Sequence, residues 1–158
     1  MANEYEPSPR ARVREQVERY EATGGREGAT NEGRPVVILT TIGARTGSVR
    51  KTPVMRIERD GTYAAVASAA GATSDPAWYR NLRAHPDRVR LQDGATVLRM
   101  RAREVSGAEK EEWWRIAEAN WPHFPEYRAK AEDREIPIVL LEPTRGVEDG
   151  PRAEDPRP

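Results

Sequence analysis

Residues 43–57, GARTGSVRKTPVMRI, contain four basic side chains and no acidic one. The turn and the start of the following strand would bring backbone N–H groups, a hydroxyl and guanidinium groups together, a combination that suits a phosphate or a carboxylate. A solvated strand rim could carry the same residues, so the segment alone leaves an anion site and an ordinary surface open. The candidate anion-binding residues are Arg45, Thr46, Gly47, Arg50 and Lys51.

A second candidate lies in residues 76–82, PAWYRNL. Trp78 and Leu82 are four residues apart, so they share one face of a helix. Asn81 is a poor residue for a helix interior, because its amide competes for backbone partners. A functional hydrogen bond would explain Asn81, and the alternative is a core tryptophan beside a surface asparagine.

Residues 121–127, WPHFPEY, place an aromatic side chain at every third position of a segment interrupted by proline. Phe124 is the one phenylalanine of the chain, and its place in a broken segment favours a pocket wall over a core layer. Aromatic side chains with a few polar groups are typical of a small-molecule site. A cap on the core is the alternative for Trp121, Phe124 and Tyr127.

The other candidate residues are few. Ser68 ends a predicted strand and could donate a hydrogen bond to a ligand, but no serine has an evident histidine and aspartate partner for a hydrolase triad. The chain has no cysteine, and its two histidines are His85 and His123. We therefore expect no metal site.

Alternating short apolar segments and glycine turns predict the elements that position these residues. We expect strands at 36–42, 49–58, 62–68, 88–92, 95–105 and 136–141. We expect helices at 10–22 and 77–85, one that follows Ser106 and carries Trp113 and Trp114, and a short one at 124–133. Six strands with antiparallel hairpins and peripheral helices predict a mainly β fold, a small barrel with helices packed outside.

The composition of the chain limits its domain organisation and the classes of partner that it could have. With 26 basic and 26 acidic residues the net charge is zero, which argues against a nucleic-acid partner. Residues 1–9 and 144–158 are rich in proline and charge, so we expect two disordered tails around one domain at 10–143. There is no signal-peptide core and no apolar run of about 20 residues, which predicts a cytoplasmic protein. Residues 10–22 form either a helix packed by a thin apolar stripe or a lid or membrane-surface helix, which leaves peripheral membrane contact open.

Four stretches, taken together and in this order, resemble the deazaflavin-dependent nitroreductase family of actinobacteria, a branch of the flavin/deazaflavin oxidoreductases. They are LTTIGARTGSVRKTPVMR (39–56), VASAAGATSDPAWYRNLRAHP (66–86), the aromatic segment 121–127 and DREIPIVLLEP (133–143). The resemblance implies a split β-barrel like that of FMN-binding proteins, with six antiparallel strands, that binds coenzyme F-420.

The resemblance also implies roles for particular residues. The cofactor's phosphate and oligoglutamate tail would be held by the five candidate anion-binding residues, with Thr52, Pro53 and Met55 on the same strand. The deazaflavin ring would face Ala67, Ser68 and Ala69. The helix that closes the cofactor groove would contribute Ala77, Trp78 and Asn81. The acceptor pocket would be shaped by Met55, Trp121, Phe124 and Tyr127, and a proton could come from Ser68 or Tyr127.

The activity implied is transfer of a hydride from reduced F-420 to a small-molecule acceptor, a quinone, a nitro compound or an activated enone, by a monomer or homodimer. The cofactor supplies the chemistry and the protein supplies orientation. Residues 69–75 contain no basic residue, where the family often carries lysine or a glycine pair. Met55, Trp121 and Phe124 stand where nitroreductases place tyrosine, which favours quinones. The alternatives are an FMN-dependent reductase and a non-enzymatic fatty-acid or lipid binder.

Overall fold

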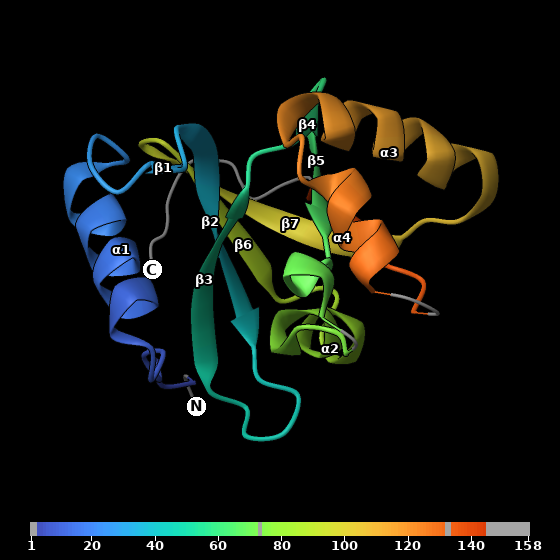
Figure 1. Cartoon of the computed structure of the whole chain (residues 1–158). Coiled ribbons are helices and arrows are strands. Elements are labelled where there is room, and N and C mark those ends of the chain that lie inside the picture. The colour runs from blue at the N-terminus through green and yellow to red at the C-terminus, as the bar shows by residue number, and fades with distance from the viewer. Residues whose placement is uncertain (1–2, 73, 132–133, 145–158) are drawn as a thin grey trace.

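The structure, a computed structural model, describes residues 3–72, 74–131 and 134–144, and its centre is a curled antiparallel sheet (Figure 1). The sheet contains β1 (Thr30–Asn31), β2 (Arg34–Ile42), β3 (Val49–Met55), β4 (Glu58–Arg59), β5 (Thr62–Val66), β6 (Val89–Asp93), β7 (Thr96–Glu104) and β8 (Ile138–Pro143). The order across the sheet is β1-β2-β6-β7-β8-β5-β4, and β3 pairs with β2.

The barrel is open between β3 and β5. In the described residues β3 pairs with β2, and β5 pairs with β4 and β8, but β3 and β5 do not pair with each other. Six strands have five or more residues, and β1 and β4 have two residues each. The mainly β split-barrel prediction is confirmed, with two short strands added to the six expected.

One predicted strand is divided in two. The strand expected at 49–58 ends at Met55, because the chain changes partner there: Arg56 N still donates to Pro35 O of β2, but Ile57 O already accepts from Ala64 N of β5. Ile57 is buried in a second apolar cluster, and β4 begins at Glu58. Asp60-Gly61 forms the hairpin turn between the two expected strands, since β4 and β5 pair on either side of it.

The inner face of the curled sheet forms the main core. Val37 and Leu39 of β2 point into it, together with Leu91 of β6, Met100 of β7 and Leu141 of β8. Side chains alternate along a strand, so Val36 and Ile38 point outward, where they pack against a helix. The uninterrupted apolar run of β2 is therefore explained by burial on both faces of the sheet.

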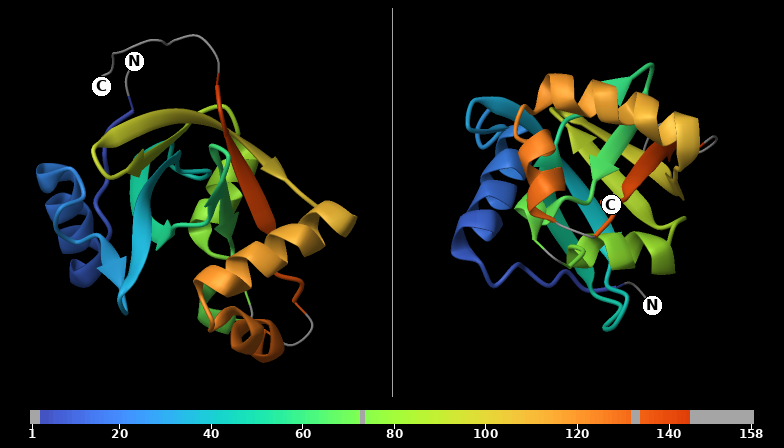
Figure 2. Two further views of the ribbon diagram at one scale, coloured as in Figure 1. Left: turned by 90° about the horizontal axis from the view of Figure 1, so that it is seen from above. Right: turned by 45° about the vertical axis from the view of Figure 1, so that its right-hand side comes forward.

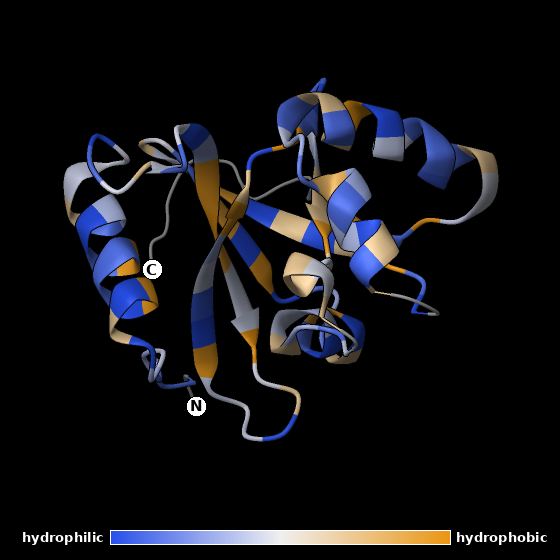
Figure 3. Cartoon of the chain, viewed as in Figure 1, coloured by the Kyte–Doolittle hydropathy of each residue, from blue (hydrophilic) through white to orange (hydrophobic). Residues whose placement is uncertain are grey.

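Helices cover the outside of the sheet on two sides (Figure 2). On one side lies α1 (Ala11–Thr23), whose Val17 and Tyr20 pack on β2. It ends at Gly24, which has the left-handed φ of +61° that favours glycine. Figure 3 shows that the rest of the α1 surface is largely hydrophilic. The helix predicted at 10–22 is therefore present, and its apolar stripe is used for packing.

On the other side lie α3 (Gly107–Asn120) and α4 (Phe124–Lys130), which pack against the outer faces of β5 and β8. Two shorter elements follow β5 in the chain, the 3-10 turn η1 (Ala69–Gly71) and α2 (Ala77–Ala84). No helix of the described residues is long and apolar enough to cross a membrane.

The N-terminal segment differs from the disordered tail expected at 1–9. Its residues 3–9 are described, and Tyr5 forms a parallel bridge with Val49 at the start of β3. Glu6 N donates to Val49 O over 2.9 Å, and Val49 N donates to Glu4 O over 2.7 Å. The free edge of β3 supplies unpaired backbone groups, and this segment satisfies two of them. The tail expected at 144–158 lies, apart from Thr144, outside the described residues.

Candidate functional site

Most of the residues singled out in the sequence lie on four elements that form two neighbouring pairs, the turn at 43–48 with α2 and η1 with α4 (Figure 1). Two contacts join them. Asn81 of α2 is hydrogen-bonded to the basic turn, and α4 packs directly on η1. Gly71 makes the second contact possible, because a Cβ there would lie 2.9 Å from Cβ of Lys130 and 3.1 Å from the carbonyl oxygen of Tyr127.

The contacts of Asn81 explain why an asparagine lies inside α2. Its side chain is 7% exposed. Its Nδ2 donates to Thr41 Oγ1 over 3.0 Å, and its Oδ1 accepts from Ala44 N over 2.9 Å. These two bonds fasten the end of β2 and the start of the basic turn to α2. The alternative of a surface asparagine is therefore wrong, because the Asn81 amide is buried and holds the basic turn in position.

The basic turn presents its side chains to solvent. Arg45 and Thr46 are exposed, and Gly47 has a φ of +74° that lets the chain reverse. Gly47 N donates to Gly43 O over 2.9 Å, and Thr46 Oγ1 accepts from Ser48 N over 3.2 Å. The turn is thus braced internally while the Arg45 guanidinium faces outward.

The expected ligands on β3 divide between the two faces of that strand. Arg50 and Thr52 stand opposite Thr41 and Leu39 on the inner face, near α2. Lys51, Pro53 and Met55 alternate with them and point to the outer face, toward α1. An anion held by Arg50 and Lys51 together must therefore lie at the edge of β3, next to the N-terminal segment that pairs with Val49.

Both basic residues of that edge already have carboxylate partners, which the sequence analysis missed. Lys51 Nζ lies 2.7 Å from Glu21 Oε2 of α1, and 4.9 Å from the centre of the Tyr5 ring. Arg50 Nη1 lies 3.6 Å from Glu6 Oε2. The helix and the segment before it therefore neutralise charges that the sequence assigned to a ligand.

The segment after β5 has an unusual backbone. Ala67 and Ser68 are buried, and Ala69, Ala70 and Gly71 have φ values of 48°, 54° and 83°. Left-handed conformations are unfavourable for alanine, so the segment needs support from elsewhere. Sequence reasoning missed the support, which is Arg134, although Arg134 lies in the 133–143 stretch that carried the family resemblance.

Two of the expected pocket-wall aromatics are core residues. Phe124 is 2% exposed and meets the Trp114 ring edge-on at 5.9 Å, and Trp121 is 6% exposed in the same cluster. The pocket-wall interpretation is therefore corrected for Trp121 and Phe124, which cap the core. Tyr127 is half-buried beside η1 and the His123 ring, so it alone of the three aromatics reaches the surface there.

The remaining expected residues line α2 and the outer side of β3. Trp78 packs partly on the main core, while Ala77 is exposed. Met55 contacts both the α1 cluster and the α3–α4 cluster. Tyr79 stays protonated and donates to Glu104 over 2.6 Å, because burial and then this bond raise its pKa to about 12.

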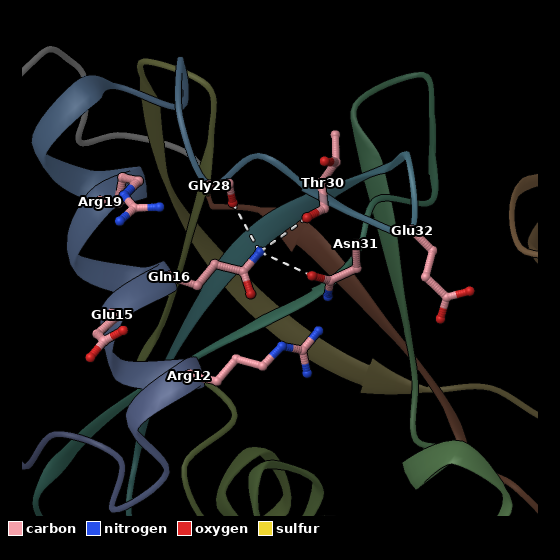
Figure 4. A pocket seen from close by; sticks show the side chains of 8 residues that line it. All are labelled: Arg12, Glu15, Gln16, Arg19, Gly28, Thr30, Asn31 and Glu32. Atoms are coloured by element: carbon pink, nitrogen blue, oxygen red, sulfur yellow. Dashed lines mark hydrogen bonds between the residues drawn. The ribbon is translucent and has the colours of Figure 1, made fainter.

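A polar hollow of about 370 Å³ lies elsewhere, between α1 and β1 (Figure 4). Gln16 crosses it, and its Nε2 donates to Gly28 O, Thr30 O and Asn31 Oδ1. Two arginines and two glutamates balance each other around it. None of the expected site residues lines this hollow, so it is separate from the candidate site.

Comparisons with known proteins identify the family of this chain. The family model described as F420H(2)-dependent quinone reductase matches residues 12–143. An F420H(2)-dependent quinone reductase of Mycobacterium tuberculosis is 32% identical over 126 residues, which are 77% of this chain and 83% of that protein.

Two solved structures are similar in sequence and fold. A reductase described as F420-H2 dependent is 45% identical, with a TM-score of 0.64 over 69% of this chain and 95% of that one. A chain described as a domain-swapped dimer is 44% identical, with a TM-score of 0.66 over 85% of this chain and all of the other. The protein therefore belongs to the F420H(2)-dependent quinone reductase family.

Proposed function

We propose that this protein transfers a hydride from reduced coenzyme F-420 to a quinone. The observation that carries the proposal is the Asn81 bridge, which joins the basic turn and the end of β2 to the helix beside residues 67–69. The basic turn and the small residues 67–69 are thereby held in fixed positions relative to each other. The family match supports the same cofactor and acceptor class.

The residues present fit such a cofactor. Arg45 is exposed, and Arg50 and Lys51 lie on either face of β3 at its edge, which gives cationic donors for a phosphate and carboxylates. Ala67 and Ser68 are almost completely buried, so a flat ring bound here would meet the more exposed Ala69 and the half-buried Trp78. The bound deazaflavin would supply the hydride, and these residues would fix its position.

Proton supply belongs to the same proposal. Ser68 ends the ring-facing segment, and Tyr127 of α4 lies against η1, where its carbonyl approaches Gly71. Either hydroxyl could deliver a proton to a reduced quinone. A positioned general acid contributes roughly 10²-fold or more to a rate, so Ser68→Ala and Tyr127→Phe identify which hydroxyl acts.

The experiment is a titration of the purified protein with F-420, followed by turnover of the reduced cofactor with menadione. In the titration, we expect micromolar protein to quench the fluorescence of F-420. In the turnover assay, we expect the fluorescence of oxidised F-420 to recover as the reduced cofactor reduces menadione. Arg45→Ala combined with Arg50→Ala should weaken cofactor binding. A yellow protein that turns over with FMN and not with F-420 would overturn the proposal, as would bound lipid without turnover.

Assembly and location are part of this proposal. The relative described as a domain-swapped dimer supports a homodimer, which light scattering of the purified protein tests. Cytoplasmic location and peripheral membrane contact through residues 10–22 stay predictions. The α1 stripe is packed on β2, so any membrane contact must use its charged face, and flotation with anionic vesicles tests that contact.

A further inference from the structure

Arg134 makes a group of hydrogen bonds that converge on the segment after β5. Its Nη2 donates to Ser68 O over 2.7 Å, and its Nη1 donates to Ala67 O over 3.1 Å. Its Nε donates to Ala72 O over 2.9 Å. The planar guanidinium therefore satisfies carbonyls at both ends of η1, and its side chain is only 11% exposed.

The charge of Arg134 is balanced in the same place. Its Nη1 lies 2.6 Å from Asp75 Oδ1, the one acidic side chain that the sequence places in this loop. Asp75 does not cap α2, because Pro76 is the N-cap residue and α2 has no side-chain cap. Asp75 thus serves as the counterion of Arg134.

The segment held in this way is the one with three successive positive φ values, at Ala69, Ala70 and Gly71. Its own hydrogen bonds are few, Gly71 N to Ser68 O and Ala72 N to Ala69 O. Strained backbone persists where surrounding structure over-determines it, and such places cluster at functional sites. Here the hydrogen bonds of Arg134 and the packing of α4 hold the strained backbone in place.

We propose that Arg134 is a positioning residue that holds residues 67–72 in the conformation required to align the cofactor ring for hydride transfer. The inference rests on the proposed function and assigns Arg134 no contact with cofactor or quinone. Because the anionic tail would bind at β3 and the basic turn, on other elements, loss of Arg134 should change the rate far more than the affinity. Misplacement by about 1 Å can cost roughly 10²-fold in rate.

The test compares Arg134→Lys and Arg134→Gln with Arg103→Gln. Lysine keeps the charge beside Asp75 but cannot reach several carbonyls with a planar fork of donors. Arg103 is the control, because its guanidinium also makes several hydrogen bonds, to Glu109 and Glu142, but it lies on β7 away from the site. The measurements are kcat and KM for menadione, the F-420 Kd, the isotope effect with deuterated reduced cofactor, and amide hydrogen exchange.

For both Arg134 variants we expect a 10- to 100-fold lower kcat, a larger isotope effect and an F-420 Kd within about threefold of wild type. The amides of Gly71 and Ala72 should exchange at least about tenfold faster, while Arg103→Gln leaves all of these unchanged. Unchanged exchange at those amides, or a Kd that weakens as much as kcat falls, would overturn the inference.

The two proposals fail in different ways. A wild-type protein that binds no F-420 contradicts the proposed function, whatever the variants do. A wild-type protein with full F-420 turnover, together with Arg134 variants that match its kcat and isotope effect, overturns only the role of Arg134.

Discussion

Lys51 of β3 and Glu21 of α1 form a direct ion pair, with Nζ and Oε2 2.7 Å apart and both side chains at least two-thirds covered. Glu6 lies 3.6 Å from the neighbouring Arg50 in the same way. The charges expected to hold the anionic tail of a cofactor are thus already met by carboxylates of the N-terminal region. A bound tail would have to displace these carboxylates or share the cations with them.

Replacement of Glu21 by glutamine should therefore strengthen F-420 binding. Partly exposed ion pairs contribute about 0.2–1 kcal/mol, so removal of the competing carboxylate should lower the Kd about two- to fivefold. Fluorescence titration at low and high salt measures this change. Glu27→Gln is the control, because Glu27 pairs with the exposed Arg19 and not with β3. Weaker binding by the Glu21 variant would show that the pair helps to build the site rather than competing for it.

Asn81→Ala should destabilise the protein and loosen the basic turn at once. The substitution removes the partner of the buried Thr41 hydroxyl and of Ala44 N. An unsatisfied buried polar group costs about 1–3 kcal/mol, and a looser turn should weaken F-420 binding roughly three- to tenfold.

Urea unfolding, hydrogen exchange at Ala44 and cofactor titration measure the three effects of that substitution. Asn120→Ala is the matched control, because its Nδ2 bonds the exposed end of its own helix, at Ile116 O, and no other described residue. Exchange at Ala44 that stays at the wild-type rate would contradict the supporting role of Asn81.

Local features of the fold were predictable from the sequence. The buried run of β2, the Asp60-Gly61 hairpin and the end of α1 at Gly24 depend on residues that are adjacent in the chain. The pairing of β2 with β6 and the missing pairing between β3 and β5 were not predictable, because they depend on contacts between distant segments. The division of the strand at Met55 also depends on other segments, because the chain changes its hydrogen-bond partner there from β2 to β5.

The site shows the same limit. The sequence identified Asn81 as an unusual residue, but its partners, Thr41 and Ala44, are about 40 residues away. Arg134 is 66 residues from Ser68, and no local pattern connects the two. Phe124 was misassigned because its rarity was interpreted as function, whereas the structure places its ring against Trp114 in the core.

Protonation of Asp93 at low pH should lower the free energy of unfolding. Burial opposes its ionisation, but hydrogen bonds from Arg56, at 2.9 Å, and Tyr63, at 2.5 Å, outweigh burial and lower its pKa. A lowered carboxyl pKa stabilises the fold above the unfolded value near 4, and this stabilisation is lost as the pH falls through the folded value. Asp93→Asn should therefore cost about 1–3 kcal/mol at pH 7, and less as the pH falls below about 4.

Urea midpoints of wild type and the Asp93 variant, from pH 7 to about pH 2.5, measure that difference. Asp87→Asn is the control, because Asp87 is 64% exposed and pairs with the equally exposed Arg101. A difference between wild type and Asp93→Asn that stays constant over the whole range would contradict the assignment of acid sensitivity to Asp93.

Arg90 and Arg99 stand directly opposite each other on β6 and β7, and like charges in that position destabilise a sheet. Burial, together with the Arg99 guanidinium, lowers the pKa of the half-buried Arg90. Arg99→Glu would convert the repulsion into an ion pair and should stabilise the fold by about 0.5–1 kcal/mol, or raise Tm by roughly 1–4 °C. Arg101→Glu, two residues along the same strand, should lower Tm, because Arg101 already pairs with Asp87 at 3.3 Å. Thermal unfolding of the two variants at low salt separates the effects, and equal shifts in both would show that net charge, rather than the Arg90–Arg99 contact, sets the stability.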